Sequence, residues 1–242
     1  MLLLAVAGAA INAQGYVSNW TASSGLRPDQ ASTNWTYYGN SPSVTPVFWS
    51  NYMVLSTSPN TEVSFFETGP ASIDIPSDLT IEFKARFGSR KGNSTAISPM
   101  SVYFGLGGGL GSVLYLGLDD VWLAGGNNIR GVSASVDTDD LFHTYRLQLS
   151  GSTAGSAINV FYDNGSNPLF TGSLLLDSAL NGNVERIGFG DHSWADSGVS
   201  KWDYLWHNAS CVPINSVPEP TTTALLIAGG AMLLSRRNRK AA

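Results

Sequence analysis

Apolar and polar residues alternate along most of the chain, as they do in strands that bury one face. The clearest case is residues 79–87, LTIEFKARF, in which every odd-numbered residue is apolar and every even-numbered one is polar or charged. This period of two predicts a half-buried strand. Similar runs recur between turn residues, and helical periodicity is absent before residue 219. The pattern therefore predicts two packed antiparallel sheets over residues 35–210.

The alternation also predicts the core. We expect the following side chains to be buried: Leu79, Ile81, Phe83, Phe87, Tyr145, Leu147, Leu149, Ile158, Val160 and Tyr162. Near the end of the sheet region, Trp202, Tyr204 and Trp206 occupy alternate positions, which predicts that all three share one face. We expect Trp202 and Trp206 to pack in the interior. Asp163, Asn164 and Gly165 predict the tight turn of a hairpin.

Composition fits one all-β domain of about 200 residues with targeting segments. Only 13% of the 242 residues are charged, and the single cysteine, Cys211, excludes an internal disulfide framework. Residues 1–13 are expected to be a secretory signal cleaved after Ala10 or Ala13. The basic start of such signals is missing, which predicts a start codon further upstream. A buried first strand is the alternative.

The C-terminal segment has three features in order. Val217-Pro218-Glu219-Pro220 comes first, then the uncharged stretch Thr221–Ser235, then the basic run RRNRK at 236–240. A spanning helix needs roughly 20 apolar residues, so this 15-residue stretch is marginal as a permanent anchor. The prolines break a helix and leave extended backbone that a processing enzyme can grip.

This order resembles the PEP-CTERM sorting signal of bacterial surface proteins. The matching residues are Val217, Pro218, Glu219, Pro220, Arg236, Arg237 and Arg239. The resemblance implies recognition by an exosortase-type enzyme, a transient anchor in the membrane, and transfer of the body to the cell surface or extracellular matrix. The expected organisation is a signal peptide (1–13), a sandwich (14–210), a linker (211–220), a transmembrane helix (221–235) and a basic cytoplasmic tail (236–242).

Without its four terminal basic residues the chain has nine Lys and Arg against 18 Asp and Glu, near −9. An acidic body argues against nucleic acid and anionic lipid as partners.

Four stretches in order are similar to a laminin-G-like, concanavalin A-like jelly roll: LTIEFKARF, LFHTYRLQLSG, INVFYDNGSNPLFTG and IGFGDHSWADSGVSKWDYLWHN. The resemblance implies two antiparallel sheets of six or seven strands, in a fold found in lectins, glucanases and matrix proteins.

Glucanases of that fold carry a Glu-x-Asp-x-x-Glu motif, which this chain lacks. A Gly-x-Ser-x-Gly elbow is also absent. His143 shares a face with apolar residues, so we interpret it as a structural histidine. We therefore assign no catalytic residues, and one cysteine without paired histidines argues against a zinc site.

The stretch 190–207 is the best candidate for ligand contact. Its loop carries Asp191, His192, Trp194 and Asp196, and an exposed Trp ring can stack on a sugar while carboxylates bind hydroxyls. No cofactor is expected. Asp119, Asp120, Asp137, Asp139 and Asp140 leave structural calcium open, although we interpret them as solvated turns.

Two functions stay open. One is a non-catalytic exported surface or matrix protein whose jelly roll binds polysaccharide. The other is a surface polysaccharide-degrading enzyme, a hydrolase or lyase, on the same fold.

Overall fold

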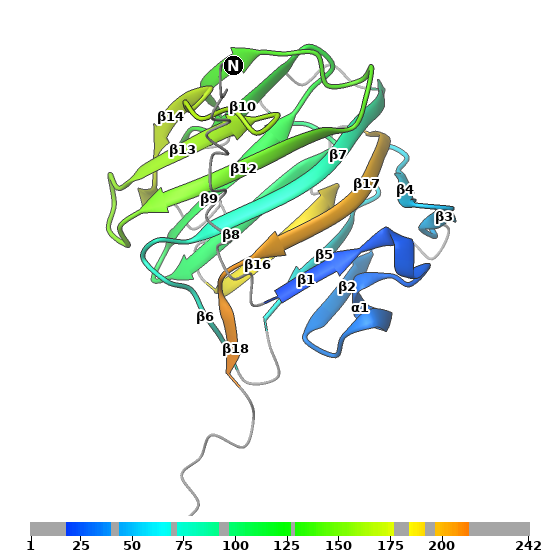
Figure 1. Ribbon diagram of the computed structural model, residues 1–242, viewed down its shortest axis with the longest axis horizontal. Coiled ribbons are helices and arrows are strands. Elements are labelled where there is room, and N and C mark those ends of the chain that lie inside the picture. The colour runs from blue at the N-terminus through cyan, green and yellow to red at the C-terminus, as the bar shows by residue number, and fades with distance from the viewer. Residues whose placement is uncertain are drawn as a thin grey trace, which may run out of the picture.

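The computed structural model describes residues 18–39, 44–68, 72–91, 97–126, 129–176, 184–191 and 197–212. Within these ranges two eight-stranded antiparallel sheets lie face to face, as predicted (Figure 1). Helical structure there amounts to two single turns, η1 (Ala22–Ser24) and α1 (Pro28–Ala31).

The strands of sheet A follow the order β14 (Phe170–Ser173), β13 (Ala157–Tyr162), β12 (His143–Ser150), β7 (Thr80–Lys91), β17 (Ser197–His207), β4 (Tyr52–Ser56) and β3 (Val47–Trp49), and β1 (Ser18–Thr21) also pairs with β17. The strands of sheet B follow the order β11 (Arg130–Ser135), β10 (Asp120–Ala124), β9 (Leu110–Leu116), β8 (Ser101–Gly107), β16 (Glu185–Asp191), β5 (Val63–Glu67) and β2 (Trp35–Gly39), and β15 (Leu175–Leu176) pairs with β9. A separate two-stranded ribbon joins β6 (Ser72–Asp74) to β18 (Ser210–Val212).

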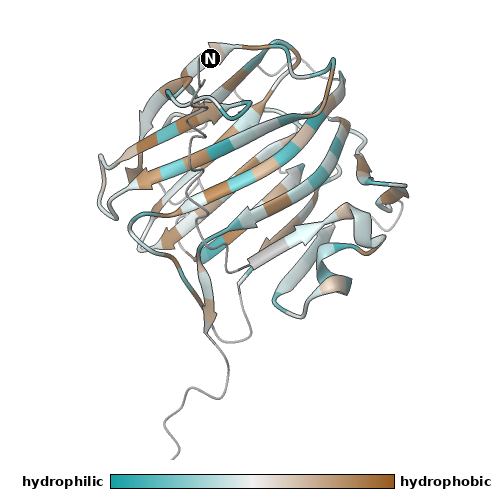
Figure 2. Cartoon of the chain, in the orientation of Figure 1, coloured by the Kyte–Doolittle hydropathy of each residue, from teal (hydrophilic) through white to brown (hydrophobic). Residues whose placement is uncertain are grey.

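The period-two alternation places the core between the sheets, and Figure 2 shows it as alternating apolar and polar bands along the strands of sheet A. Nine of the ten predicted core side chains are at most 4% exposed. Tyr162 differs and is half-buried. Its ring packs against the core, but its hydroxyl reaches the backbone oxygen of Asp137 at 2.9 Å, so the polar end of the side chain stays at the margin.

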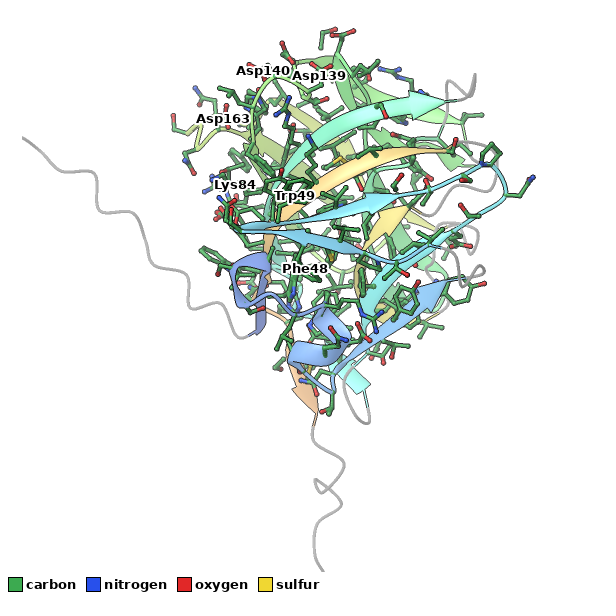
Figure 3. All side chains as sticks on the ribbon, turned by 90° about the vertical axis from the view of Figure 1, so that its right-hand side faces the viewer. Phe48, Trp49, Lys84, Asp139, Asp140 and Asp163 are labelled. Carbon is green, nitrogen blue, oxygen red and sulfur yellow. The ribbon has the colours of Figure 1, made fainter. Side chains whose placement is uncertain are left out.

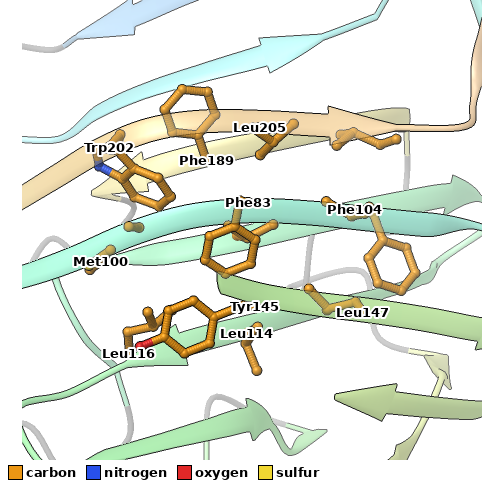
Figure 4. Packing of buried hydrophobic residues seen from close by; sticks show 14 of the residues in the cluster. Phe83, Met100, Phe104, Leu114, Leu116, Tyr145, Leu147, Phe189, Trp202 and Leu205 are labelled. Atoms are coloured by element: carbon orange, nitrogen blue, oxygen red, sulfur yellow. The ribbon is translucent and has the colours of Figure 1, made fainter. Parts of the chain in front are cut away.

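Large rings join the two sheets. Phe189 on β16 of sheet B and Trp202 on β17 of sheet A have ring centroids 4.7 Å apart, and within sheet A Phe83 stacks on Tyr145 at 5.1 Å (Figure 4). Each fully buried side chain of this size contributes about 1.5–3 kcal/mol relative to an exposed one. These rings pack in one core together with many buried aliphatic side chains.

The predicted hairpin turn is confirmed between β13 and β14. Asp163 and Asn164 have φ of 46° and 59°, the left-handed region that Asn and Asp tolerate best among residues with side chains. The turn places the Asp163 carboxylate beside the start of β12, where its Oδ1 accepts the Thr144 backbone N–H at 3.1 Å.

Candidate glycan-binding surface

The side of sheet A that faces away from the core is polar and half-exposed, and Figure 1 views the sheet from this side. The same alternation that buries Ile81, Phe83 and Ala85 turns their neighbours outward. We call this surface the outer face of sheet A; on its three central strands it comprises Glu82, Lys84, Arg86, Thr144, Arg146, Lys201, Asp203, Tyr204 and Trp206.

A β-bulge in β17 decides which aromatic residues reach this face. Trp202 lies opposite Ala85 and Tyr204 lies opposite Lys84, so two steps on β17 match one step on β7. Trp202 is consequently fully buried, as predicted, whereas Tyr204 and Trp206 point outward and are half-buried. The prediction that the three share a face, with Trp206 in the interior, is wrong because the extra residue inverts the alternation.

Tyr204 and Trp206 form a flat aromatic pair on the outer face of sheet A. Their ring centroids are 4.2 Å apart with an interplanar angle of 18°. The Tyr204 hydroxyl donates to Glu82 Oε1 at 3.1 Å, and burial, together with the nearby Glu82 and Asp203 carboxylates, raises the pKa of Tyr204 to about 12. The phenol thus stays protonated at neutral pH, and the pair combines an apolar surface with fixed polar groups.

A loop after β11 borders this face at one end. The ring of Phe142 in this loop contacts Tyr52 of β4 at a centroid distance of 5.3 Å, and Arg86 Nε donates to the Asp139 backbone oxygen at 2.7 Å. Figure 3 shows Asp139, Asp140 and Asp163 gathered at this end, above Lys84.

His143 clamps the loop to the β13–β14 turn. Its Nε2 lies 2.7 Å from Asp140 Oδ1 and its Nδ1 lies 2.7 Å from Asp163 Oδ2. Burial alone would lower the pKa of His143, but hydrogen bonds to the two carboxylates outweigh it and raise the pKa. Both ring nitrogens are engaged, so neither is available as a base, in agreement with a structural role.

Of the four predicted ligand residues, only Asp191 lies within the described part of the chain. Its side chain is 1% exposed and accepts a hydrogen bond from the hydroxyl of Thr57, the residue that follows β4. Asp191 of sheet B is thereby linked to sheet A. His192, Trp194 and Asp196 lie outside the described residues. Ligand contact by this loop stays a prediction.

A buried polar cluster was not predicted from the sequence. Glu67 and His207 are both 0% exposed, with His207 Nε2 2.5 Å from Glu67 Oε2, and the Cys211 thiol donates to Glu67 Oε1 at 2.8 Å. Burial, reinforced by the Glu67 carboxylate, raises the pKa of Cys211 to about 12, so the thiol is not a ready nucleophile. One signal was readable: Glu67 occupies the same alternating positions as the apolar Val63 and Phe65.

The outer side of sheet B also carries aromatic residues, but they are covered. Tyr103, Tyr115 and Trp122 are at most 4% exposed, and the Tyr103 ring lies across Gly188, where any Cβ would overlap it. Arg130 stacks on Trp122 at 4.6 Å. These three rings therefore offer no open surface comparable to the Tyr204–Trp206 pair, and the exposed aromatic residue on this side among the described residues is the single Tyr38 of β2.

Within the described residues, no group of three or more His, Cys, Asp or Glu side chains is placed to hold a metal ion, which includes the aspartates considered for calcium at 119, 120, 137, 139 and 140. No described helix has the length and apolar character needed to cross a membrane. The signal peptide, the sorting motif at 217–220, the segment 221–235 and the basic tail lie outside the described residues.

No protein-family model and no curated protein matches the chain. Among solved structures, the carbohydrate esterase vb_24B_21 of the Shiga toxin-encoding bacteriophage phi24B is similar, with 11% identity, 81% of this chain and 99% of that chain covered, and a TM-score of 0.57. The metal-free carbohydrate recognition domain of Emp46p gives 16% identity, coverage of 72% and 88%, and a TM-score of 0.44. The Ca²⁺-bound exoplasmic/lumenal domain of VIP36 is 10% identical, with 81% of this chain and 90% of that chain covered and a TM-score of 0.45. The likeness to the phage protein is one of fold.

Proposed function

We propose that the chain is a non-catalytic, exported bacterial surface protein whose sandwich binds polysaccharide on the outer face of sheet A. The observation that carries this is the Tyr204–Trp206 pair, a half-exposed flat aromatic surface whose neighbours Glu82, Lys84 and Asp203 supply hydrogen-bonding groups. Aromatic rings of this kind combine apolar contact area with a polar rim, which suits the apolar face and hydroxyl edge of a pyranose.

A non-catalytic role is supported by the chemistry of the titratable groups. The carboxylates of a retaining or inverting glycosidase must work as a pair across the scissile bond. Here Glu82 accepts the Tyr204 hydroxyl, His143 is bonded at both nitrogens, and Glu67 is fully buried. The alternative, a surface polysaccharide-degrading enzyme, has no comparable arrangement in its favour among the described residues.

Binding is tested with the full chain on immobilised polysaccharides, alongside an assay for newly released reducing ends. Trp206→Ala and Tyr204→Ala should each weaken binding about tenfold, because each removes half of the stacked surface. Tyr38→Ala is the matched control, since Tyr38 is a 43% exposed tyrosine on β2 of the other sheet. Equal binding by all three variants and wild type contradicts the proposed surface, and release of reducing ends contradicts the non-catalytic role.

Export through the C-terminal signal is the second part of the proposal. Expressed with an exosortase, the protein should reach the surface with its C-terminus near Val217–Pro220. Replacing Pro218, Glu219 and Pro220 by Ala should leave full-length chain in the membrane, because a helix can then extend through the cleavage region. If mass spectrometry of the wild-type surface protein still finds residues 236–240 attached, the segment is an ordinary anchor.

A further inference from the structure

The outer face of sheet A collects basic residues that are scattered in the sequence. Four of the nine Lys and Arg that precede residue 236, namely Lys84, Arg86, Arg146 and Lys201, project from the adjacent strands β12, β7 and β17. The acidic residues that the same strands turn outward are only two, Glu82 and Asp203. A net positive strip therefore crosses a body whose overall charge is near −9.

Two of these cations face each other directly. Arg86 on β7 and Lys201 on β17 are cross-strand partners, an arrangement that destabilises a sheet when both residues carry the same charge. Arg86 Nε donates to the Asp139 backbone oxygen, and Arg86 also interacts electrostatically with the Asp139 carboxylate. The Lys201 side chain forms no hydrogen bond or ion pair with any described residue. Local rules of this kind are typically broken where function requires it, and an anion between the two would remove the repulsion.

Arg146 is also without an acidic partner. It lies opposite Glu82, yet Glu82 Oε1 takes the Tyr204 hydroxyl, and Arg146 forms no ion pair within the described part of the chain. Its guanidinium stacks on the Phe161 ring at 4.5 Å, and its buried Nε has no hydrogen-bond partner. Stacking fixes the orientation of the planar guanidinium group and leaves its N–H donors unused. This arrangement suits bidentate binding of a carboxylate.

Three of the acidic groups that border this strip are engaged by other partners, and Asp139 is the one that interacts with Arg86. Asp140 and Asp163 both bond His143, and Asp163 also accepts the Thr144 N–H, while Asp137 Oδ1 accepts the backbone N–H groups of 139 and 140. These residues lie at the loop end of the sheet. Arg146 lies two residues beyond Thr144 along β12, away from that end, and Lys84 is the cation that Asp203 neutralises, at 3.1 Å.

From these contacts we infer that the ligand of this surface is an acidic polysaccharide, whose carboxylates bind Arg146 and the Arg86–Lys201 pair while a sugar ring stacks on Tyr204 and Trp206. This inference rests on the proposed function and specifies its ligand class. It also explains how an acidic protein can bind an acidic polymer, since the positive charge is concentrated at the contact.

The test compares binding of the full chain to polygalacturonate and to neutral dextran. Wild type should bind polygalacturonate about tenfold more tightly, and this preference should fade between about 50 and 300 mM NaCl as the charges are screened. Arg146→Gln and Lys201→Gln should each reduce polygalacturonate binding about fivefold or more and leave dextran binding unchanged. Arg130→Gln is the matched control, an arginine stacked on an aromatic ring of the other sheet.

The outcomes separate the two proposals. Equal affinity for both polymers, or unchanged polygalacturonate binding in both Gln variants, overturns the acidic ligand while polysaccharide binding stands. Failure to bind either polymer at any salt concentration overturns both. If Arg146→Gln does not fold, as judged by circular dichroism, the half-exposed Lys201→Gln decides alone.

Discussion

His207 Nε2 of β17 lies 2.5 Å from Glu67 Oε2 of β5, so a fully buried hydrogen bond joins sheet A to sheet B. The opposite ring nitrogen, His207 Nδ1, is buried without a hydrogen-bond partner. The contact with Glu67 is therefore the hydrogen bond that compensates for the burial of this polar ring.

Glu67→Ala should reduce the free energy of unfolding by about 3–5 kcal/mol, because it strands the buried His207 and opens a cavity. Urea denaturation measures the change. Asp203→Ala, which breaks the exposed Lys84–Asp203 pair, should cost less than about 1 kcal/mol. Similar losses in the two variants would contradict the assigned importance of the buried contact.

Cys211 should react slowly with alkylating reagents. With its pKa raised to about 12 by burial and by Glu67, the thiolate is scarce near neutral pH. At about pH 8, iodoacetamide should modify Cys211 at least about a hundredfold more slowly than a small free thiol. Glu67→Gln removes the carboxylate that favours the protonated thiol, so it should speed the reaction; a rate unchanged by that substitution would contradict this account.

Two tyrosine hydroxyls should respond differently to removal. The Tyr145 hydroxyl is buried with no hydrogen-bond partner, so Tyr145→Phe should leave stability unchanged or raise it by up to about 1 kcal/mol. The Tyr162 hydroxyl bonds the Asp137 backbone oxygen and lies 2.7 Å from His143 Nδ1, so Tyr162→Phe should cost about 1 kcal/mol. Thermal denaturation of both variants checks the contrast, and the reverse order would contradict it.

His143 should make stability depend on pH. Its pKa is raised in the folded protein, because hydrogen bonds to Asp140 and Asp163 outweigh the opposing effect of burial. The stabilisation is therefore complete below the unfolded pKa of about 6.5 and disappears as pH rises through the higher folded value. The stability difference between wild type and His143→Asn should shrink from about pH 6 to about pH 9. A difference that stays constant over this range would mean that the clamp does not depend on a charged imidazole.

The sequence alone was sufficient to predict that the chain forms two antiparallel sheets and which side chains of their strands are buried. Alternation over 79–87 and in the strands around residues 145 and 160 predicted the core side chains, because hydrophobic burial acts on each strand through its own period of two. The Asp163–Asn164–Gly165 turn was readable for a similar reason, since left-handed backbone selects local residue types. Cys211, placed near the tail by sequence, gave no hint of its contact with Glu67.

The candidate surface depended on tertiary structure. An inserted residue in β17 turned Tyr204 and Trp206 outward, and a bulge reflects how two strands pair rather than how one strand is composed. Strand order then brought Arg146, Lys84, Arg86 and Lys201, which are up to 117 residues apart in the chain, onto three neighbouring strands. Pattern along a chain determines which face of a strand is buried, but charge and aromatic contacts across strands exist only once the register is set.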